Sequence, residues 1–250
     1  MAAHRQAAAA DARPFDDLFA DARLRPPPRP FRDTLARGRA VIAEVKRRSP
    51  SKGDLAPDLV PGVLAKAYAA GGAACLSVLT DADFFGALPG DLGEARAACE
   101  LPVLRKDFTV SERDVCDARI MDADAVLLIV AALSDDELSR FAAVARQLGL
   151  AALVEVHTEH ELARALATGA DLIGVNQRDL TTFAVDDRLA ARLREQMPDG
   201  VVSVAESGIR DGGDVARLFA AGYDAVLVGE SLVTAADPGV AVRQLLRGAP

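Results

Sequence analysis

The sequence is poor in aromatic and sulfur-containing residues. Its 250 residues include no Trp, two Tyr and three Cys. Cys75, Cys99 and Cys116 are an odd set without CxxC spacing, which argues against a disulfide framework or a zinc site and indicates reduced thiols. No run approaches the roughly 20 apolar residues of a membrane span, and residues 1–14 lack the apolar core of a secretory signal. We therefore predict a cytoplasmic protein that does not bind a membrane.

Several common functional signatures are also missing. No GxGxxG fingerprint occurs, so a dinucleotide-binding fold is not indicated. The formal net charge of −8 argues against nucleic acid as a partner. His157 and His160 have HxxH spacing, but no third ligand lies near them in the sequence. We interpret them as a loop residue and a helix-surface residue, and we expect no metal site.

What the chain does contain is a repeat of short apolar strands, polar or Gly-containing loops and helices. Half of the residues are hydrophobic, mostly Ala, Val and Leu, which favours an α/β protein with parallel strands. The predicted strands lie near 41–46, 74–79, 102–106, 124–130, 151–156, 171–176, 201–205 and 224–228. Eight βα units over residues 41–250 predict a (β/α)₈ TIM barrel, because a doubly wound open sheet usually has fewer strands.

Helices are predicted between these strands, with recognisable starts and ends. The predicted ranges are 59–70, 91–99, 112–121, 135–148, 159–168, 187–197, 214–221 and 239–246. Ser134 and Thr158 each precede acidic residues and are predicted N-caps. Gly149, Gly169 and Gly222 stand where helices should stop.

Residues 1–40 are predicted to be an extension in front of the barrel. The first 14 residues are Ala-rich, and we expect them to be partly disordered. Phe15, Leu18, Phe19 and Ala22 follow the spacing of a short amphipathic helix. The run RPPPRP at 25–30 then predicts a stiff connector.

Charged residues gather where the predicted strands end. In the stretch VIAEVKRRSPSKG (41–53), Ile42, Glu44 and Lys46 face one side of the strand because side chains alternate. Other strand ends carry Lys106, Glu155 and Glu206. The carboxyl ends of barrel strands form one face, so these groups are predicted to share a pocket. Carboxylates and ammonium groups in one pocket shift each other's pKa values, which suits acid–base catalysis.

Two loops have the composition of a phosphate site. Ser207-Gly208 follows the seventh predicted strand, and Gly229-Glu230-Ser231 follows the eighth. Barrels of this kind often bind phosphate there through backbone N–H groups, so the Glu230 side chain should point away. Phe84-Phe85-Gly86 after the second strand predicts an apolar wall. The pattern favours a phosphorylated substrate with an aromatic part.

These segments together resemble the indole-3-glycerol phosphate synthase family. The resemblance is carried by IAEVKRRSPSKG (42–53), LSVLTDADFFG (76–86), PVLRKDF (102–108), DAVLLIV (124–130), LVEVH (153–157), IGVNQRDLTTF (173–183), AESGI (205–209) and LVGESL (227–232). It implies a (β/α)₈ enzyme of tryptophan biosynthesis. Such an enzyme closes the indole ring of 1-(2-carboxyphenylamino)-1-deoxyribulose 5-phosphate with loss of CO₂ and water, without a cofactor.

The resemblance also implies a role for each site residue. Lys106 is the general acid that protonates the substrate carbonyl; Glu155 is the acid–base group for dehydration, assisted by Glu44. Lys46 holds the substrate carboxylate and helps position the ring. The implied orienting residues are Asn176, Arg178 and Glu206. The implied apolar pocket is formed by Phe85, Phe108, Leu127 and Leu180. The implied phosphate site is formed by Ser49, Ser207, Gly208, Gly229 and Glu230.

The chain departs from the family pattern at three places, one of which is Ala87, where a second Gly is common after Phe84-Phe85-Gly86. Asp122 stands where the family usually has Gly, which should cost some stability. The N-terminal segment is rich in Ala and Pro where the family usually has a helix rich in Lys and Glu. We expect a monomer, and other tryptophan-pathway enzymes stay open as partners. Two alternatives also stay open: a paralogue acting on a substituted anthranilate-derived substrate, and a catalytically silent barrel that binds a phosphorylated ligand.

Overall fold

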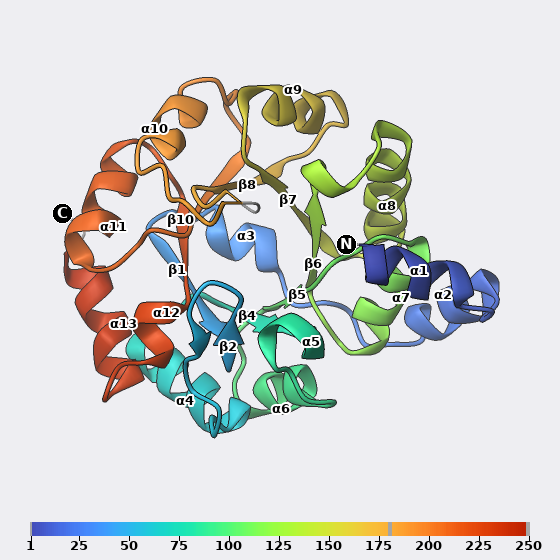
Figure 1. Ribbon diagram of the computed structural model, residues 1–250, viewed down its shortest axis with the longest axis horizontal. Helices are drawn as coiled ribbons and strands as arrows, with labels where there is room; N and C mark the ends of the chain where they lie inside the picture. Colours follow the sequence, from blue (N-terminus) through green and yellow to red (C-terminus); the bar gives the residue numbers. More distant parts are fainter. Residues whose placement is uncertain (1, 180–181, 249–250) are drawn as a thin grey trace.

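The chain folds as a closed eight-stranded parallel barrel with helices around it (Figure 1). The computed structural model describes residues 2–179 and 182–248. The barrel strands are β1 (Ala40–Val45), β4 (Cys75–Leu79), β5 (Val103–Lys106), β6 (Ala125–Ile129), β7 (Ala151–Val156), β8 (Leu172–Asn176), β9 (Val202–Glu206) and β10 (Ala225–Val228). Parallel pairing of β1 with β10 and with β4 closes the ring. The predicted (β/α)₈ barrel is confirmed.

The helices that follow the strands agree with the predicted ranges to within a few residues. They are α4 (Pro61–Gly71), α6 (Asp91–Ala98), α7 (Glu112–Ile120), α8 (Asp135–Gln147), α9 (Glu159–Ala167), α10 (Leu189–Arg194), α11 (Gly212–Ala220) and α13 (Pro238–Arg247). The start predicted for α10 was too early, because the Asp186 side chain accepts a hydrogen bond from the Arg188 N–H and holds a turn there.

The predicted helix boundary signals are confirmed. Ser134 forms a capping box with Glu137, and the Thr158 side chain accepts a hydrogen bond from the Glu161 N–H. Gly149, Gly169 and Gly222 adopt positive φ angles of 73°, 75° and 93°. These left-handed conformations end helices at little steric cost only with glycine.

Short elements occupy the loops at the mouth of the barrel, meaning the face formed by the carboxyl ends of its strands. They are the hairpin β2 (Arg48–Ser49) and β3 (Gly53–Asp54), the single turns α5 (Ala82–Phe85) and α12 (Glu230–Val233), and the 3₁₀ turn η1 (Val130–Ala132). The sequence reasoning missed these elements, because two to four residues are too few to show a period.

Two apolar layers hold the barrel together. Val41, Ala43 and Val45 of β1 face outward into the layer between strands and helices. Ile42 faces inward and packs with residues such as Leu104 and Leu153 inside the barrel. The alternation predicted for the first strand is therefore confirmed, and it directs Glu44 and Lys46 toward the barrel axis at the mouth.

The N-terminal extension runs from the mouth to the opposite face. It comprises α1 (Ala2–Ala10), α2 (Phe15–Arg23) and α3 (Phe31–Leu35), and α1 and α2 lie beside α7 and α8 in Figure 1. The first of these helices, α1, lies within the Ala-rich stretch of residues 1–14. Phe31 and Leu35 of α3 are fully buried and close the floor of the barrel, which is the face opposite the mouth.

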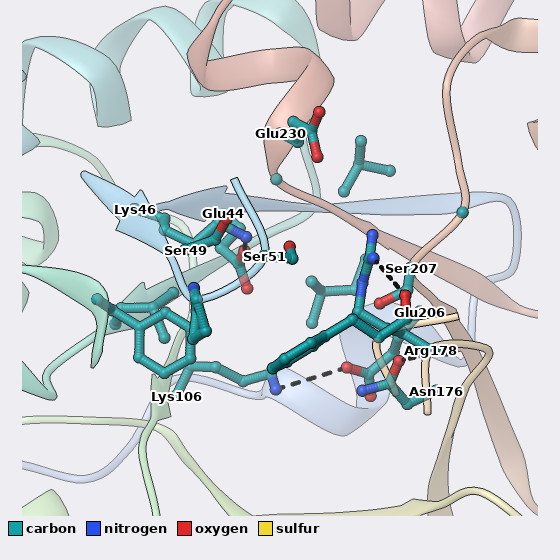
Figure 2. Close-up of a pocket in the computed structure, with 18 of the residues that line it drawn as sticks. Glu44, Lys46, Ser49, Ser51, Lys106, Asn176, Arg178, Glu206, Ser207 and Glu230 are labelled. Carbon is teal, nitrogen blue, oxygen red and sulfur yellow. Dashed lines mark hydrogen bonds and ion pairs between the residues drawn. The ribbon is translucent and has the colours of Figure 1, made fainter. Parts of the chain in front are cut away.

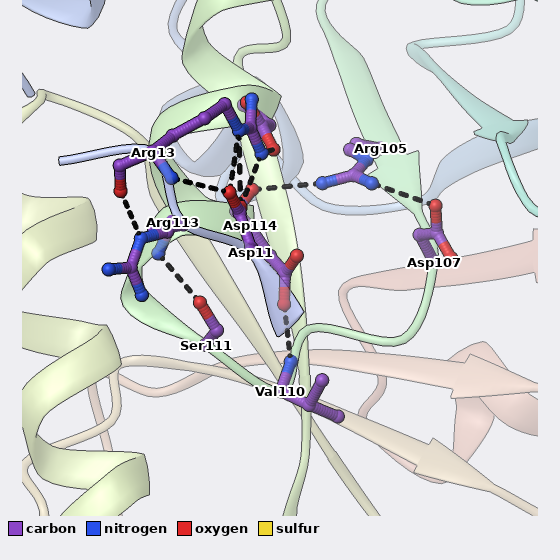
Figure 3. A network of polar contacts seen from close by, with 9 residues as sticks. Asp11, Arg13, Arg105, Asp107, Val110, Ser111, Arg113 and Asp114 are labelled. Atoms are coloured by element: carbon purple, nitrogen blue, oxygen red, sulfur yellow. Dashed lines mark hydrogen bonds and ion pairs between the residues drawn. The ribbon is translucent and has the colours of Figure 1, made fainter. Parts of the chain in front are cut away.

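Polar contacts join the extension to the barrel between these two ends. The Arg13 guanidinium pairs with Asp11 and Asp117, and its backbone carbonyl accepts a hydrogen bond from Arg113 Nε at 2.7 Å (Figure 3). Asp122, at φ 65°, pairs with Arg25 of the connector. The left-handed backbone conformation at Asp122, which we predicted to cost stability, is thus accompanied by an ion pair that the sequence did not reveal.

No helix in the described ranges is long and apolar enough to cross a membrane.

Candidate active site

A cavity of about 960 Å³ opens at the mouth of the barrel. Its wall contains fifteen of the sixteen predicted site residues, and Figure 2 shows several of them converging from different strands. They are Glu44, Lys46, Ser49, Phe85, Lys106, Phe108, Leu127, Glu155, Asn176, Arg178, Glu206, Ser207, Gly208, Gly229 and Glu230. The sixteenth, Leu180, lies outside the described residues. The topology thus brings together residues that are up to 186 positions apart (Glu44 to Glu230).

At the centre of the cavity, one ammonium group faces two carboxyl groups. Lys106 Nζ of β5 lies 3.0 Å from Glu155 Oε2 of β7 and 3.7 Å from Glu206 Oε2 of β9. Both glutamates are almost completely buried. Buried charges are costly unless paired, so each of these groups depends on the others.

The three groups have strongly different protonation tendencies. Burial alone would lower the pKa of Lys106, but the facing Glu155 and Glu206 outweigh it and raise the pKa above its ordinary value. Burial would raise the pKa of Glu155, but Lys106 and His157 lower it well below its usual range. Burial and the negative charge of Glu155 raise the pKa of Glu206 to about 8. At neutral pH the site therefore contains a cationic acid, a carboxylate base and a neutral carboxylic acid.

A second ion pair lies beside this centre on β1. Lys46 Nζ donates a hydrogen bond to Glu44 Oε1 at 2.5 Å. A Cβ atom at Gly229 would lie 2.3 Å from the same carboxylate oxygen and 3.1 Å from Lys46 Nζ. A side chain at position 229 would therefore displace the Glu44–Lys46 pair, whatever the loop binds.

Asn176 and Arg178 follow β8 and connect the centre to the next loop. Asn176 Nδ2 donates to Glu155 Oε1 at 3.2 Å, while Asn176 Oδ1 accepts from the Arg178 N–H at 3.0 Å. Arg178 Nη1 donates to the carbonyl of Phe183 at 3.0 Å. The guanidinium is thereby held at the cavity wall by its own loop.

The loops after β9 and β10 form the polar end of the cavity. Ser207 and Gly208 both adopt positive φ angles, 63° and 71°, which turn this loop sharply beside Gly229 and Glu230 on the cavity wall. The Glu230 carboxylate lies 3.1 Å from Lys52 Nζ, which belongs to the loop after β1 and also lines the cavity.

Aromatic side chains form the opposite wall. Phe84 and Phe108 line the cavity with ring centroids 6.0 Å apart, and the His4 ring of α1 lies 4.7 Å from that of Phe108. His4 Nε2 also lies 2.7 Å from an Asp81 carboxylate oxygen, so the extension touches the rim of the cavity.

His4, Asp81 and Asp107 have ligand atoms within 4.8 Å of one another. Each carboxylate already has protein partners, because Asp81 accepts from the Phe84 N–H and Asp107 pairs with Arg105 (Figure 3). We assign no ion to this group.

Sequence reasoning missed two residues that shape the centre. Gly174 of β8 leaves room for Glu206, whose Oε1 would lie 2.2 Å from a Cβ there. His157 is indeed a loop residue, and His160 is indeed exposed on α9. The sequence did not reveal that the His157 side chain lies largely buried between Glu155 and Glu161. Burial would lower the His157 pKa, but these carboxylates raise it to about 10.

The chain is similar to one named family along almost its whole length. A family model described as indole-3-glycerol phosphate synthase matches residues 2–245. A protein of that name from Nocardioides sp. is 56% identical over 220 residues, which are 88% of this chain and 85% of the relative. One from Laribacter hongkongensis is 49% identical over 245 residues, covering 96% and 93%. A solved 3-hexulose-6-phosphate synthase shares the fold, with a TM-score of 0.66, 17% identity and coverage of 84% and 100%.

Proposed function

The chain belongs to the indole-3-glycerol phosphate synthase family, and we propose on that basis that it closes the indole ring of 1-(2-carboxyphenylamino)-1-deoxyribulose 5-phosphate with loss of CO₂ and water. The observation that carries the proposal is the buried contact of 3.0 Å between Lys106 Nζ and Glu155 Oε2 inside the cavity. It provides an acid and a base at one reacting centre.

We assign ring closure to Lys106. In this step the ring carbon that bears the carboxylate bonds to the substrate ketone carbon, and the ketone oxygen takes a proton. Lys106 is the donor, because the surrounding carboxylates keep its amine protonated until the oxygen becomes basic. Loss of CO₂ from the same ring carbon then restores the aromatic ring.

We assign dehydration to Glu155, with Glu44 assisting. Loss of water consumes one proton at the leaving hydroxyl and releases one from the substrate, so an acid–base group must both accept and return a proton. Glu155 starts as a carboxylate and lies in contact with Lys106. The Glu44–Lys46 pair beside it is placed to hold the substrate carboxylate and ring through the Lys46 ammonium.

The remaining cavity residues are assigned to substrate binding. The polar chain of the substrate is oriented by Asn176, Arg178 and Glu206. A neutral Glu206 can donate a hydrogen bond, which an ionised carboxylate cannot do. The apolar wall that receives the aromatic ring consists of Phe85, Phe108 and Leu127, and Leu180 is proposed with them. Ser49 and the loop residues Ser207, Gly208, Gly229 and Glu230 take the phosphate, the last three through their backbone.

We further propose that the enzyme acts as a monomer in the cytoplasm. Three free cysteines, two of them buried, fit a reducing compartment.

Turnover of the carboxyphenylamino substrate tests the proposal, because indole formation is visible by fluorescence. Wild-type protein should produce the signal. Lys106→Ala and Glu155→Gln should each lower kcat by about 10²–10⁴-fold while unfolding cooperatively. His160→Gln on the exposed side of α9 is the control and should keep wild-type turnover. Folded wild-type protein that forms no indole would exclude the assignment.

A further inference from the structure

His157 lies directly behind the proposed acid–base group. It stands two residues after Glu155, where β7 ends, so both side chains leave the chain on the same side. The ring is largely buried, with 11% of the side chain exposed, and it is absent from the residues that line the cavity. It therefore touches the Glu155 carboxylate from the side that the substrate does not reach.

Glu161 fixes the orientation of this ring. Glu161 Oε2 accepts a hydrogen bond from the His157 N–H at 2.8 Å and lies 3.2 Å from His157 Nδ1. The Glu161 N–H in turn donates to Thr158 Oγ1 at the start of α9. Backbone and side chain of His157 are thus bound by one carboxylate, which leaves Nε2 as the free end of the ring.

That free end is directed at Glu155. His157 Nε2 lies 3.4 Å from Glu155 Oε1, and it is buried with no well-aligned hydrogen bond of its own in the described structure. The other carboxylate oxygen, Oε2, faces Lys106 Nζ. Glu155 therefore lies between two cationic groups, each contacting a different oxygen.

The surrounding charges favour a protonated ring. Glu155 on β7 and Glu161 on α9 face the two ring nitrogens directly. Lys106 and Glu206 lie beyond Glu155 on β5 and β9, and they act on the ring more weakly through that carboxylate. Arg164 of α9 acts on Glu161. The two carboxylates in contact with the ring outweigh the more distant cations Lys106 and Arg164.

We propose that His157, held by Glu161, is a positioning residue that fixes the Glu155 carboxylate toward Lys106 and stabilises its negative charge. The inference rests on the proposed function, in which Glu155 must accept a proton. When Glu155 becomes neutral, the imidazolium keeps Glu161 but loses the negative charge facing Nε2, so return of the proton to the substrate or to Lys106 is favoured. His157 itself exchanges no proton with the substrate.

The kinetic test uses His157→Gln, which keeps an amide donor but removes the charge. We expect kcat to fall about tenfold with KM within about twofold, because the ring does not line the cavity. The acidic limb of the kcat–pH profile should move upward by roughly one pH unit, since a contacting opposite charge lowers a carboxyl pKa by about 1–3 units. Glu161→Gln should shift the limb in the same direction by less. An unmoved limb in both variants would overturn the proposal.

Two controls separate this role from a non-specific effect of substitution and from a loss of folding. His160→Gln, three residues away and exposed, should leave both limbs in place. If His157→Gln does not fold, as judged by thermal unfolding, the Glu161→Gln profile decides.

A spectroscopic test is independent of turnover. In the 250-residue protein, ¹⁵N NMR of the ring nitrogens should show His157 as an imidazolium at pH 8, assigned by its loss in His157→Gln. A neutral ring at pH 8 would refute the inference, whereas a charged ring in a protein that makes no indole would refute only the proposed function.

Discussion

The mouth of the barrel buries charged side chains at its centre, whereas the floor buries apolar ones. At the mouth, Glu155 and Glu206 are buried beside Lys106. The free-energy cost of burying these groups is offset by their contacts with one another. At the floor, the apolar side chains of Phe31 and Leu35 close the barrel. Burial of charge costs free energy whereas burial of apolar surface releases it. The floor therefore stabilises the folded barrel, and burial of the charged groups that the chemistry needs at the mouth offsets part of that stabilisation.

The N-terminal extension repeats this contrast within 40 residues. Its α3 is anchored by apolar burial, whereas α1 has no buried residue and is attached through polar contacts. Arg5 of α1 pairs with Glu137 and donates to the Ala132 carbonyl at 2.7 Å. Contacts of this kind are weaker and exchange more easily with water. The end of the extension that touches the substrate cavity is thus the end that is easiest to release.

The largest expected effect is on the floor. Phe31→Ala should destabilise the protein by about 3–5 kcal/mol, since it leaves a cavity under the barrel. Turnover per folded molecule should stay within about twofold of wild type. Urea unfolding and an indole assay on the same sample measure both quantities. A proportional loss of kcat at full folding would show that floor and mouth are coupled.

A substitution at the mouth should lower turnover more than it lowers stability. Gly174→Ala places a Cβ atom 2.2 Å from Glu206 Oε1, so the carboxyl group must shift from its position beside Lys106. Small misplacements in a site can cost about 100-fold in rate, and we expect a fall in kcat of that order. Gly93→Ala in α6 meets nothing within 4 Å and is the matched control, with unchanged kcat. Wild-type kcat in Gly174→Ala would contradict this role for Gly174.

The cost of the buried charge at the mouth should appear as a pH dependence of stability. The folded pKa of Glu206 is raised to about 8 from an ordinary value of 4.5. The folded state then binds the extra proton, so this group's contribution is fully present below its unfolded pKa and is lost as pH rises to the folded value. The slope from this group is about −1.4 kcal/mol per pH unit in that window. Glu206→Gln should remove it, as urea unfolding at pH 6 to 8 would show; an unchanged slope would contradict the raised pKa.

The smallest expected effect concerns α1. Arg5→Ala removes the Glu137 pair and the Ala132 contact, and we expect KM to rise about two- to fivefold with kcat unchanged. Gln6→Ala, on the exposed side of the same helix, is the control. Steady-state kinetics at two salt concentrations check the result, because added salt should raise the wild-type KM by a larger factor than that of Arg5→Ala. Equal KM values for both variants would show that α1 does not cover the substrate.

Much of this architecture could be predicted from local patterns. Period-two alternation places Ile42 inside and Val41 outside, and eight βα units leave few topologies other than a barrel. Caps such as Ser134 depend on residues three positions apart. The site could be predicted as a set because strand ends meet at one face. The roles of its members remain proposals.

Other features depend on contacts between distant segments and left no local signal. The Arg25–Asp122 pair joins residues 97 positions apart, and the space beside Gly174 is filled by a side chain from the next strand. The folded placement of α1 depends on Asp81 and Glu137, which no pattern in residues 1–14 indicates.

The sequence therefore determines the barrel, the direction of each strand's side chains and the kind of chemistry at its mouth, because these follow from short-range periodicity and from a fixed rule of topology. The tertiary structure decides which of those groups carry a charge. Protonation depends on distances of a few ångströms between β5, β7, β9 and α9, and on the exclusion of water from between them. His157 is the clearest case: a loop histidine in the sequence becomes, between Glu155 and Glu161, part of the site's electrostatics.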